Sequence, residues 1–311
     1  MKKLIAVLTV TVFFTGLIFC EEAAKESDKV RYAAHITAAV TFPLGAQLNV
    51  SEVIKVPVMN FNTALTRGNN IAFKIGAELT PITLEGKFDI IWTPIAFLEL
   101  YAGAGIGSGW TIKKLHGLSV TTADASGRTV KTPVNFKRPF YSVNFGGAFQ
   151  FDLGALIPTP WTHVVFRIDQ YALYRGLAGV DRYASWIYKN DAGMNRNGFT
   201  YCGTYLIGYQ MPLPLSLIAL RVETEKTFYA VPSGLDKRDW GEDQYYVAFG
   251  PVLNFTAAKI LNIMLVAQWE TLLSYKEADR FYQNQKIDRN KKPLIGFKRV
   301  GVIFDIKIPH N

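Results

Sequence analysis

The main feature of this chain is a period-two alternation of apolar and polar residues that recurs from Val30 to the C-terminus. Successive side chains of a β-strand point to opposite faces, so this alternation predicts strands with one apolar and one polar face. The clearest run alternates without a break: Tyr141, Ser142, Val143, Asn144 and Phe145. No heptad repeat or amphipathic helix of useful length interrupts the pattern. The sequence therefore predicts an all-β protein.

The connections between these runs alternate between short and long. Compact connections lie at 93–94, 153–160, 211–214 and 256–259, whereas long polar ones span about 111–138, 175–197, 227–243 and 276–293. This arrangement is typical of a transmembrane antiparallel up-and-down β-barrel with short turns at one end and long external loops at the other. Counting back from the C-terminus gives about 12 strands, with 10 to 14 possible because the stretch 44–70 alternates poorly.

The composition favours a barrel whose apolar face points outward. The chain is 49% hydrophobic and 14% aromatic, which is more than a soluble exported protein of this size normally carries. Trp92 and Trp161 flank short turns, whereas Trp110 and Tyr174 lie where strands enter long loops. These are the two heights at which aromatic rings prefer the bilayer interface. Alternation alone does not say which face is outside, and a soluble sandwich would use the same aromatics as core.

The N-terminus predicts export. Lys2 and Lys3 precede an apolar run from Leu4 to Phe19, and acidic residues follow at once, which is the layout of a signal peptide. We expect a signal peptide at 1–20, cleaved near 20–24, a short periplasmic segment at 21–29 and the barrel at 30–311. A membrane anchor is disfavoured because the run is shorter than about 20 residues; lipidation of Cys20 is the other alternative.

Cleavage leaves Cys202 as the only thiol if Cys20 is removed with the signal peptide. The mature protein then has no disulfide framework, and a closed hydrogen-bonded barrel supplies the stability instead. The net charge is +9, or +7 without Lys2 and Lys3, but export argues against nucleic acid as a partner.

The polar face carries the candidate functional residues. If it points inward, seven basic and nine acidic side chains line the interior, and they nearly cancel: Arg31, Lys74, Lys87, Arg167, Arg221, Arg299 and Lys307 against Glu78, Glu85, Asp89, Glu99, Asp169, Glu223, Glu225, Glu270 and Asp305. Rings of one sign make a pore charge-selective. This mixture predicts either a narrow polar pathway with weak selectivity or a salt-bridged, occluded interior.

Four glycines, Gly103, Gly105, Gly107 and Gly109, share one face of a strand. They are not a dinucleotide fingerprint, because the spacing is wrong and no helix follows. Two interpretations remain: a groove where a loop, bulky side chain or ligand approaches the backbone, or a plain strand bend.

The long loops are strongly basic. Segment 111–138 holds six Lys or Arg residues and one acid, Asp124, and 276–293 holds six against three acids. External loops of this kind can meet anionic lipid head groups, glycans or host surfaces, or can simply be solvated.

Enzymatic chemistry finds little support in the sequence. Only four histidines exist: His35, His116, His163 and His310. His35-Ile36-Thr37 is the nearest approach to a His–Ser pair, but it carries threonine. We interpret the acidic residues Asp239, Glu242 and Asp243 as solvated loop residues and not as catalytic carboxylates. We expect no catalytic residues, no metal site and no cofactor.

The last strand carries a resemblance to bacterial outer-membrane β-barrel proteins. Its residues Arg299-Val300-Gly301-Val302-Ile303-Phe304-Asp305-Ile306 match the assembly signal of that class at Arg299, Gly301, Phe304 and Ile306. The chain continues for five residues and lacks the terminal aromatic that many members carry. The stretch from Thr93 to Leu100, with its glycine-rich continuation, resembles spirochaetal barrel proteins.

This resemblance implies recognition by the barrel assembly machinery and a location in the lipid of the outer membrane. The expected function is a porin-like channel for small polar or charged solutes. The alternative is a non-conducting surface barrel whose basic external loops bind anionic partners.

Overall fold

The computed structural model describes residues 29–43, 45–59, 61, 63, 65–157, 159–191, 194–231, 236–240, 244–276 and 286–310. The expected signal peptide, Cys20, the segment 21–28, Glu242 and Asp243 lie outside the described residues, as does half of the predicted loop 276–293. Within the described part, no helix is long and apolar enough to cross a membrane.

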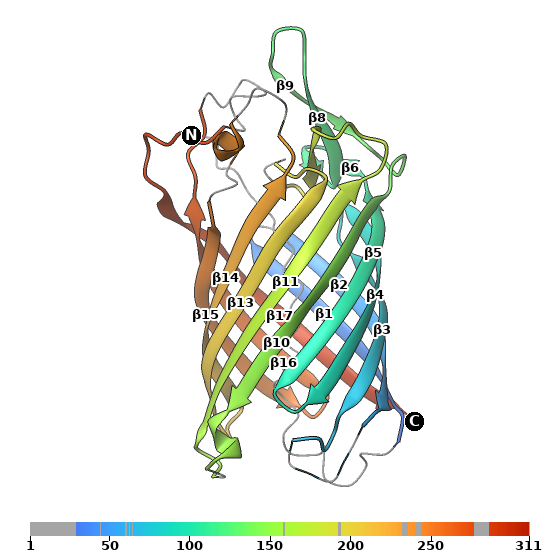
Figure 1. The fold of residues 1–311 in the computed structure, drawn as a ribbon, viewed down its shortest axis with the longest axis vertical. Helices are drawn as coiled ribbons and strands as arrows, with labels where there is room; N and C mark the ends of the chain where they lie inside the picture. The colour runs from blue at the N-terminus through green and yellow to red at the C-terminus, as the bar shows by residue number, and fades with distance from the viewer. Residues whose placement is uncertain are drawn as a thin grey trace.

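Twelve antiparallel strands close into one barrel (Figure 1), which confirms the predicted fold class and strand number. Each strand pairs with its neighbours along the chain, and the first pairs with the last to complete the circle. The strands are β1 (Arg31–Phe42), β2 (Gly45–Pro57), β3 (Asn70–Leu79), β4 (Thr83–Ile95), β5 (Leu98–Gly109), β10 (Phe140–Asp152), β11 (His163–Leu177), β13 (Gly198–Gln210), β14 (Leu215–Tyr229), β15 (Tyr246–Ala258), β16 (Leu261–Leu272) and β17 (Leu294–His310).

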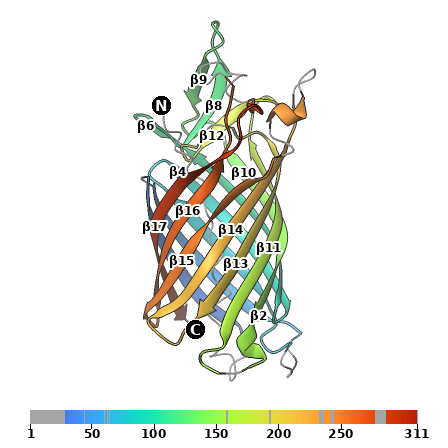
Figure 2. The same cartoon turned by 90° about the vertical axis from the view of Figure 1, so that its left-hand side faces the viewer.

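All four long connections emerge at one end of the barrel, which we call the loop end (Figures 1 and 2). The opposite end, the turn end, holds the C-terminus and the connections 58–69, 96–97, 153–162, 211–214 and 259–260. Two short connections, 43–44 and 80–82, lie at the loop end together with the long ones. The described loops differ from the expected bounds, because β11 runs to Leu177 and β14 to Tyr229. In both strands the inward and outward alternation continues into polar residues beyond the apolar stretch. The strands are therefore longer than the hydrophobic pattern indicated.

The long connections also contain structure that the sequence pattern did not predict. The stretch 110–139 forms β6 (Thr111–Ile112), β7 (Leu115–His116), β8 (Leu118–Ala123) and β9 (Thr129–Pro133), and 178–197 contains β12 (Ser185–Tyr188). Strands β12, β8 and β9 form a three-stranded sheet above the barrel. Two short 3₁₀ helices, η1 (Leu153–Ala155) and η2 (Lys237–Trp240), lie in the connections at the turn end and loop end respectively.

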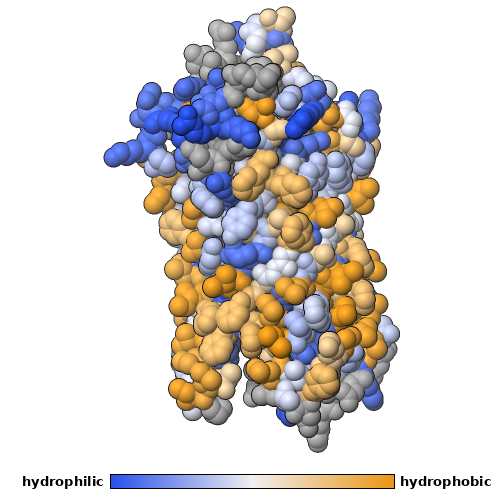
Figure 3. Space-filling view, viewed as in Figure 1, coloured by the Kyte–Doolittle hydropathy of each residue, from blue (hydrophilic) through white to orange (hydrophobic). Residues whose placement is uncertain are grey.

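The outer face of the barrel is apolar. Phe145 is 57% exposed, Ile207 58% and Ile75 57%, and side chains of this kind cover the barrel wall while hydrophilic residues gather at the loop end (Figure 3). The residues that alternate with these apolar side chains on each strand point inward, and they include most of the charged residues of the barrel strands. An exposed apolar belt of this extent is far larger than the patches that soluble monomers expose.

Aromatic side chains form contacts near both ends of this belt. At the loop end, Tyr174 stacks on Tyr141 with ring centroids 6.0 Å apart and meets Phe199 edge-on at 5.1 Å. Near the turn end, Phe166 packs against Phe149 and Phe151 at 5.8 and 5.5 Å. On these neighbouring strands, aromatic clusters thus lie at the two heights where membrane-spanning barrels carry aromatic girdles.

Part of the inner face is apolar. Inward side chains from six neighbouring strands, β11 and β13 to β17, pack into one cluster: Val165, Leu206, Leu217, Ala219, Val252, Met264, Val266 and Ile303. These positions lie mostly in the half toward the turn end. The interior is therefore not uniformly polar, as a simple in-and-out alternation would predict.

Candidate functional site in the barrel interior

All sixteen charged residues predicted for the polar face occupy inward positions of the barrel strands. Their exposure ranges from Glu78, which is 1% exposed, to Arg31, which is exposed at the turn end. Four further basic residues lie inside that the sequence pattern did not indicate: Lys55, Arg175, Lys189 and Lys298. Whether these side chains line a conducting pore stays a prediction.

At the loop end, Glu78 and Glu85 lie directly opposite each other on β3 and β4. Like charges in this position destabilise a strand pair. Lys87 Nζ compensates from within the barrel, at 2.6 Å from Glu78 Oε2 and 3.6 Å from Glu85 Oε2. The hairpin that presents the two carboxylates is tight, because Thr80 Oγ1 accepts hydrogen bonds from the backbone N–H groups of Ile82 and Thr83.

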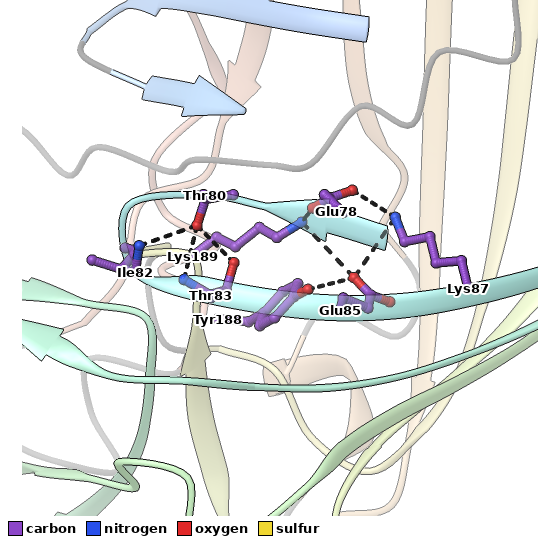
Figure 4. A network of polar contacts seen from close by, with 8 residues as sticks. All are labelled: Glu78, Thr80, Ile82, Thr83, Glu85, Lys87, Tyr188 and Lys189. Carbon is purple, nitrogen blue, oxygen red and sulfur yellow. Dashed lines mark hydrogen bonds and ion pairs between the residues drawn. The ribbon is translucent and has the colours of Figure 1, made fainter. Parts of the chain in front are cut away.

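A second lysine reaches these carboxylates from the connection 178–197 (Figure 4). Lys189 Nζ forms an ion pair with Glu78 and lies 4.0 Å from Glu85 Oε2. The neighbouring Tyr188 hydroxyl donates a hydrogen bond of 2.7 Å to Glu85. Two opposed carboxylates thus meet two ammonium groups and a phenol, and the Lys189 side chain is only 3% exposed.

The backbone at Lys189 is held in an unusual conformation that places this side chain. Lys189 and Asn190 have φ values of 51° and 60°, a left-handed region that non-glycine residues rarely occupy. Their N–H groups donate to the carbonyls of Gly117 and His116 at 2.8 and 2.7 Å. The surrounding loop therefore fixes the turn that carries Lys189.

The same connection is held by apolar packing. Trp186 is fully buried and Ile187 is 1% exposed. Trp186 and Tyr188 from β12 pack with residues of the neighbouring loop and the ends of two barrel strands: Leu118, Val134, Phe140 and Leu177. Phe140 stacks on Tyr188 with ring centroids 4.4 Å apart. A run of large apolar residues, Trp186-Ile187-Tyr188, was the sequence signal for this contact inside a loop otherwise read as polar.

Of the two interpretations of the glycine face of β5, the structure favours a groove that other groups approach over a plain bend of the strand. A Cβ on Gly103 would lie 2.1 Å from Asp89 Oδ1, and one on Gly105 would lie 2.6 Å from Glu85 Oε1. A Cβ on Gly109 would meet backbone atoms of the loop at Gly117 and Leu118. The missing side chains therefore make room for two carboxylates and for the loop. The register against β4 is continuous along these residues.

Adding a methyl group at Gly107 should destabilise the barrel more than adding one at Gly103. At Gly107 the new Cβ would lie 2.4 Å from the carbonyl oxygen of Leu84 and 2.9 Å from Cα of Glu85, so strand backbone must move. At Gly103 it meets the ends of two side chains. We expect Gly107→Ala to cost about 1–3 kcal/mol and Gly103→Ala less, measured by urea unfolding in lipid vesicles. Equal stabilities would contradict the described register.

A second polar network lies toward the turn end. Arg167 donates hydrogen bonds of 2.7 Å to both Glu99 and Gln150 and lies 3.7 Å from Asp169. Tyr101 donates to the Asp169 carboxylate. These side chains come from β5, β10 and β11, so the network joins three adjacent strands across the inner wall.

In the connection 110–139, unlike at Lys189, most basic side chains are exposed to solvent. Lys113, Lys114, Arg128, Lys131 and Lys137 are all exposed. At the tip of the β8–β9 hairpin, the Ser126 hydroxyl donates to Asp124 and, with backbone N–H groups, lowers the pKa of that carboxyl. Burial, with a smaller effect of the Lys131 charge, lowers the pKa of His116.

The remaining candidates for chemistry occupy ordinary environments. His35 is inward and buried, and it pairs across strands with Lys307 and Ser51. His163 Nδ1 lies 2.7 Å from Asp152 Oδ2 at the turn end, and His310 Nε2 lies 3.1 Å from Glu52 Oε1. Asp239 is within ion-pair distance of Lys286. In the described ranges, no three histidine, cysteine, aspartate or glutamate side chains are placed to hold a metal ion.

No protein-family model and no curated protein matches this chain. Among solved structures, it is similar to the KdgM porin in complex with disordered oligogalacturonate, at 8% identity and a TM-score of 0.36, over 90% of this chain and 99% of that one. It is also similar to the outer membrane channel DcaP of Acinetobacter baumannii, at 10% identity and a TM-score of 0.31, over 90% and 96%. Neither membership of a family nor a function follows from likenesses of this size.

Proposed function

We propose that this protein is an outer-membrane β-barrel that works as a porin-like channel for small polar or charged solutes. One observation carries the proposal: the closed barrel has most of its large apolar side chains outside and the ionisable side chains of its strands mainly inside. A soluble barrel needs the opposite arrangement, because an exposed apolar belt costs free energy in water. In hydrocarbon, a closed sheet also leaves no backbone donor or acceptor unpaired at an edge.

The turn end would then face the periplasm and the loop end the outside, as in bacterial barrels with short turns and long external loops. We also propose that the signal peptide is cleaved and that the barrel assembly machinery inserts the protein through its last strand. We further propose that the barrel is of the spirochaetal kind. It is consistent with this proposal that Phe304, at one signal position, is exposed on the outer face. Gly301, at another, faces inward against Thr41.

Passage through the outer mouth would be restricted by residues 185–190, which reach the inner wall through Lys189. The alternative function, a non-conducting surface barrel with basic loops that bind anionic partners, is favoured by this same loop packing. A fully occluded mouth would leave the exposed lysines of the loops as the functional surface.

Single-channel recording separates the two functions. Purified protein in planar bilayers should give discrete conductance steps if the barrel is a channel. Bilayers without conductance steps would refute the channel, provided that heat-modifiable gel mobility shows the inserted protein to be folded. In that case, binding to anionic lipid or glycan should be lost when Lys113, Lys114 and Lys131 are changed to glutamine.

A further inference from the structure

The last strand contains a β-bulge that turns two consecutive basic residues into the barrel. Phe297 pairs with Trp269 and Arg299 pairs with Gln268, so Lys298 is an extra residue on β17. Phe297 and Val300 point outward, being 49% and 45% exposed, whereas the Lys298 side chain is 1% exposed. In a regular strand, one of two neighbouring side chains would face the other way. Bulges of this kind re-aim side chains next to functional sites.

These two cations join a third on β14. Arg221 Nη2 lies 2.8 Å from Glu223 Oε1 on the same strand. Lys298 Nζ stays at ion-pair distance from two carboxylates, 3.8 Å from Glu223 and 3.7 Å from Glu270. Three cations therefore face two carboxylates. The next inward residue of β14, Glu225, interacts electrostatically with Arg175 and, more weakly, with Lys298. With this pair included, four cations meet three carboxylates.

Several donors in this cluster are left without an acceptor. Arg299 Nε donates 2.7 Å to Gln268 Oε1, which fixes the amide and leaves its Nε2 as a donor. Within the described residues, Gln268 Nε2, Lys298 Nζ and Arg221 Nε are buried without a partner in hydrogen-bond geometry, although Gln268 lies near Glu223 and Lys298 near Glu270. Among the acceptors of this cluster, Glu223 Oε1 is buried in the same way, so three donors stand against one acceptor. Buried donors normally have partners, and each unpaired one costs about 1–3 kcal/mol. An excess of unpaired donors together with one excess positive charge fits an anionic acceptor.

We propose that Lys298, Arg299, Arg221 and Gln268 form an anion-binding subsite on the inner wall, and that the solutes of this barrel carry a carboxylate or phosphate group. The inference rests on the proposed channel function and narrows its solute class. The Lys298 ammonium and the guanidinium groups of Arg221 and Arg299 would donate charge-assisted hydrogen bonds to the oxygens of such a group, and the Gln268 amide would donate a further one. Glu223 and Glu270 hold the cations in place and keep the affinity low enough for release.

The test combines conductance with equilibrium binding. Inorganic phosphate and succinate are added separately to the wild type, Lys298→Met, Glu223→Gln and Lys226→Met in planar bilayers. The control Lys226 lies on β14 but points to the outer face, 5.1 Å from the Tyr245 ring. We expect anion-selective steps that phosphate or succinate blocks, and a loss of blocking affinity of about tenfold in Lys298→Met. Glu223→Gln should bind more tightly, and the control should match the wild type.

Block by either oxyanion supports the subsite, and block by succinate alone assigns it to carboxylates. Conductance steps with no block and no response to Lys298→Met would overturn the inference and leave the channel standing; water would then satisfy the donors. An absence of steps would instead refute the channel. Titration calorimetry of phosphate and succinate into the detergent-solubilised wild type and Lys298→Met then tests the subsite independently, since binding needs no conductance.

Discussion

Replacing Phe145 with arginine should prevent most of the protein from reaching a stable membrane-inserted state. Phe145 lies at the middle of β10 and is 57% exposed on the outer face. If this face contacts hydrocarbon, the guanidinium would sit near the bilayer midplane at a cost of about 2–4 kcal/mol. That is a large fraction of the net stability of a typical domain. Urea unfolding in lipid vesicles, followed by heat-modifiable gel mobility, measures the loss.

The inward neighbour provides the matched control. Asn144 occupies the next position of β10 and faces the barrel interior beside Gly103. Asn144→Arg introduces the same charge in the same strand, so it should be tolerated far better than Phe145→Arg. If both variants lost the same stability, or neither did, the assignment of lipid-facing and interior-facing sides would be wrong.

Removing the Lys189 side chain should release the connection 178–197 from the inner wall. Lys189→Ala leaves the opposed carboxylates of Glu78 and Glu85 with Lys87 as their remaining charged partner among the described contacts. Breaking a buried ion pair by removing one partner costs about 3–5 kcal/mol, and undocking the loop would let water reach both acids. We expect a several-fold rise in single-channel conductance and faster cleavage of 178–197 by protease added at the loop end.

Two further variants sharpen this experiment. Lys131→Ala removes an exposed lysine of β9 and should change neither conductance nor cleavage. Trp186→Ala removes the buried indole that packs β12 against Phe140, and it should release the loop by a different route. Unchanged conductance and protease resistance in both Lys189→Ala and Trp186→Ala would show that the loop does not restrict the mouth.

The strands were predictable because their pattern is repeated and local. Period-two alternation in β10, β11, β13 and β17 defines both the strands and their two faces, and the count of twelve follows from it. The direction of the faces rested on composition and on aromatic positions. The structure gives the same direction, with most of the large apolar residues on the outer face and a smaller inward cluster toward the turn end.

The inward positions of Lys298 and Lys189 were not predicted, because their causes lie outside the local sequence pattern. Lys298 faces inward because one extra residue enters β17 opposite Gln268 and Trp269, and nothing in the alternation marks that bulge. Lys189 reaches Glu78 through a left-handed turn that depends on the carbonyls of Gly117 and His116, some 70 residues away. Contacts of this kind arise from tertiary structure, so they could not be read from a polar loop composition.

The most direct test of the membrane-spanning arrangement is spin-label accessibility along β10, in a Cys202→Ala background. Labels are placed singly at positions 142 to 150, and their collisions with lipid-soluble oxygen and a water-soluble nickel chelate are measured in vesicles. If β10 spans the bilayer with its apolar face outward, accessibility should alternate with a period of two, with oxygen dominant at 143, 145 and 149 and the chelate favoured at 142 and 144. Uniform access of the chelate to every position would contradict this arrangement.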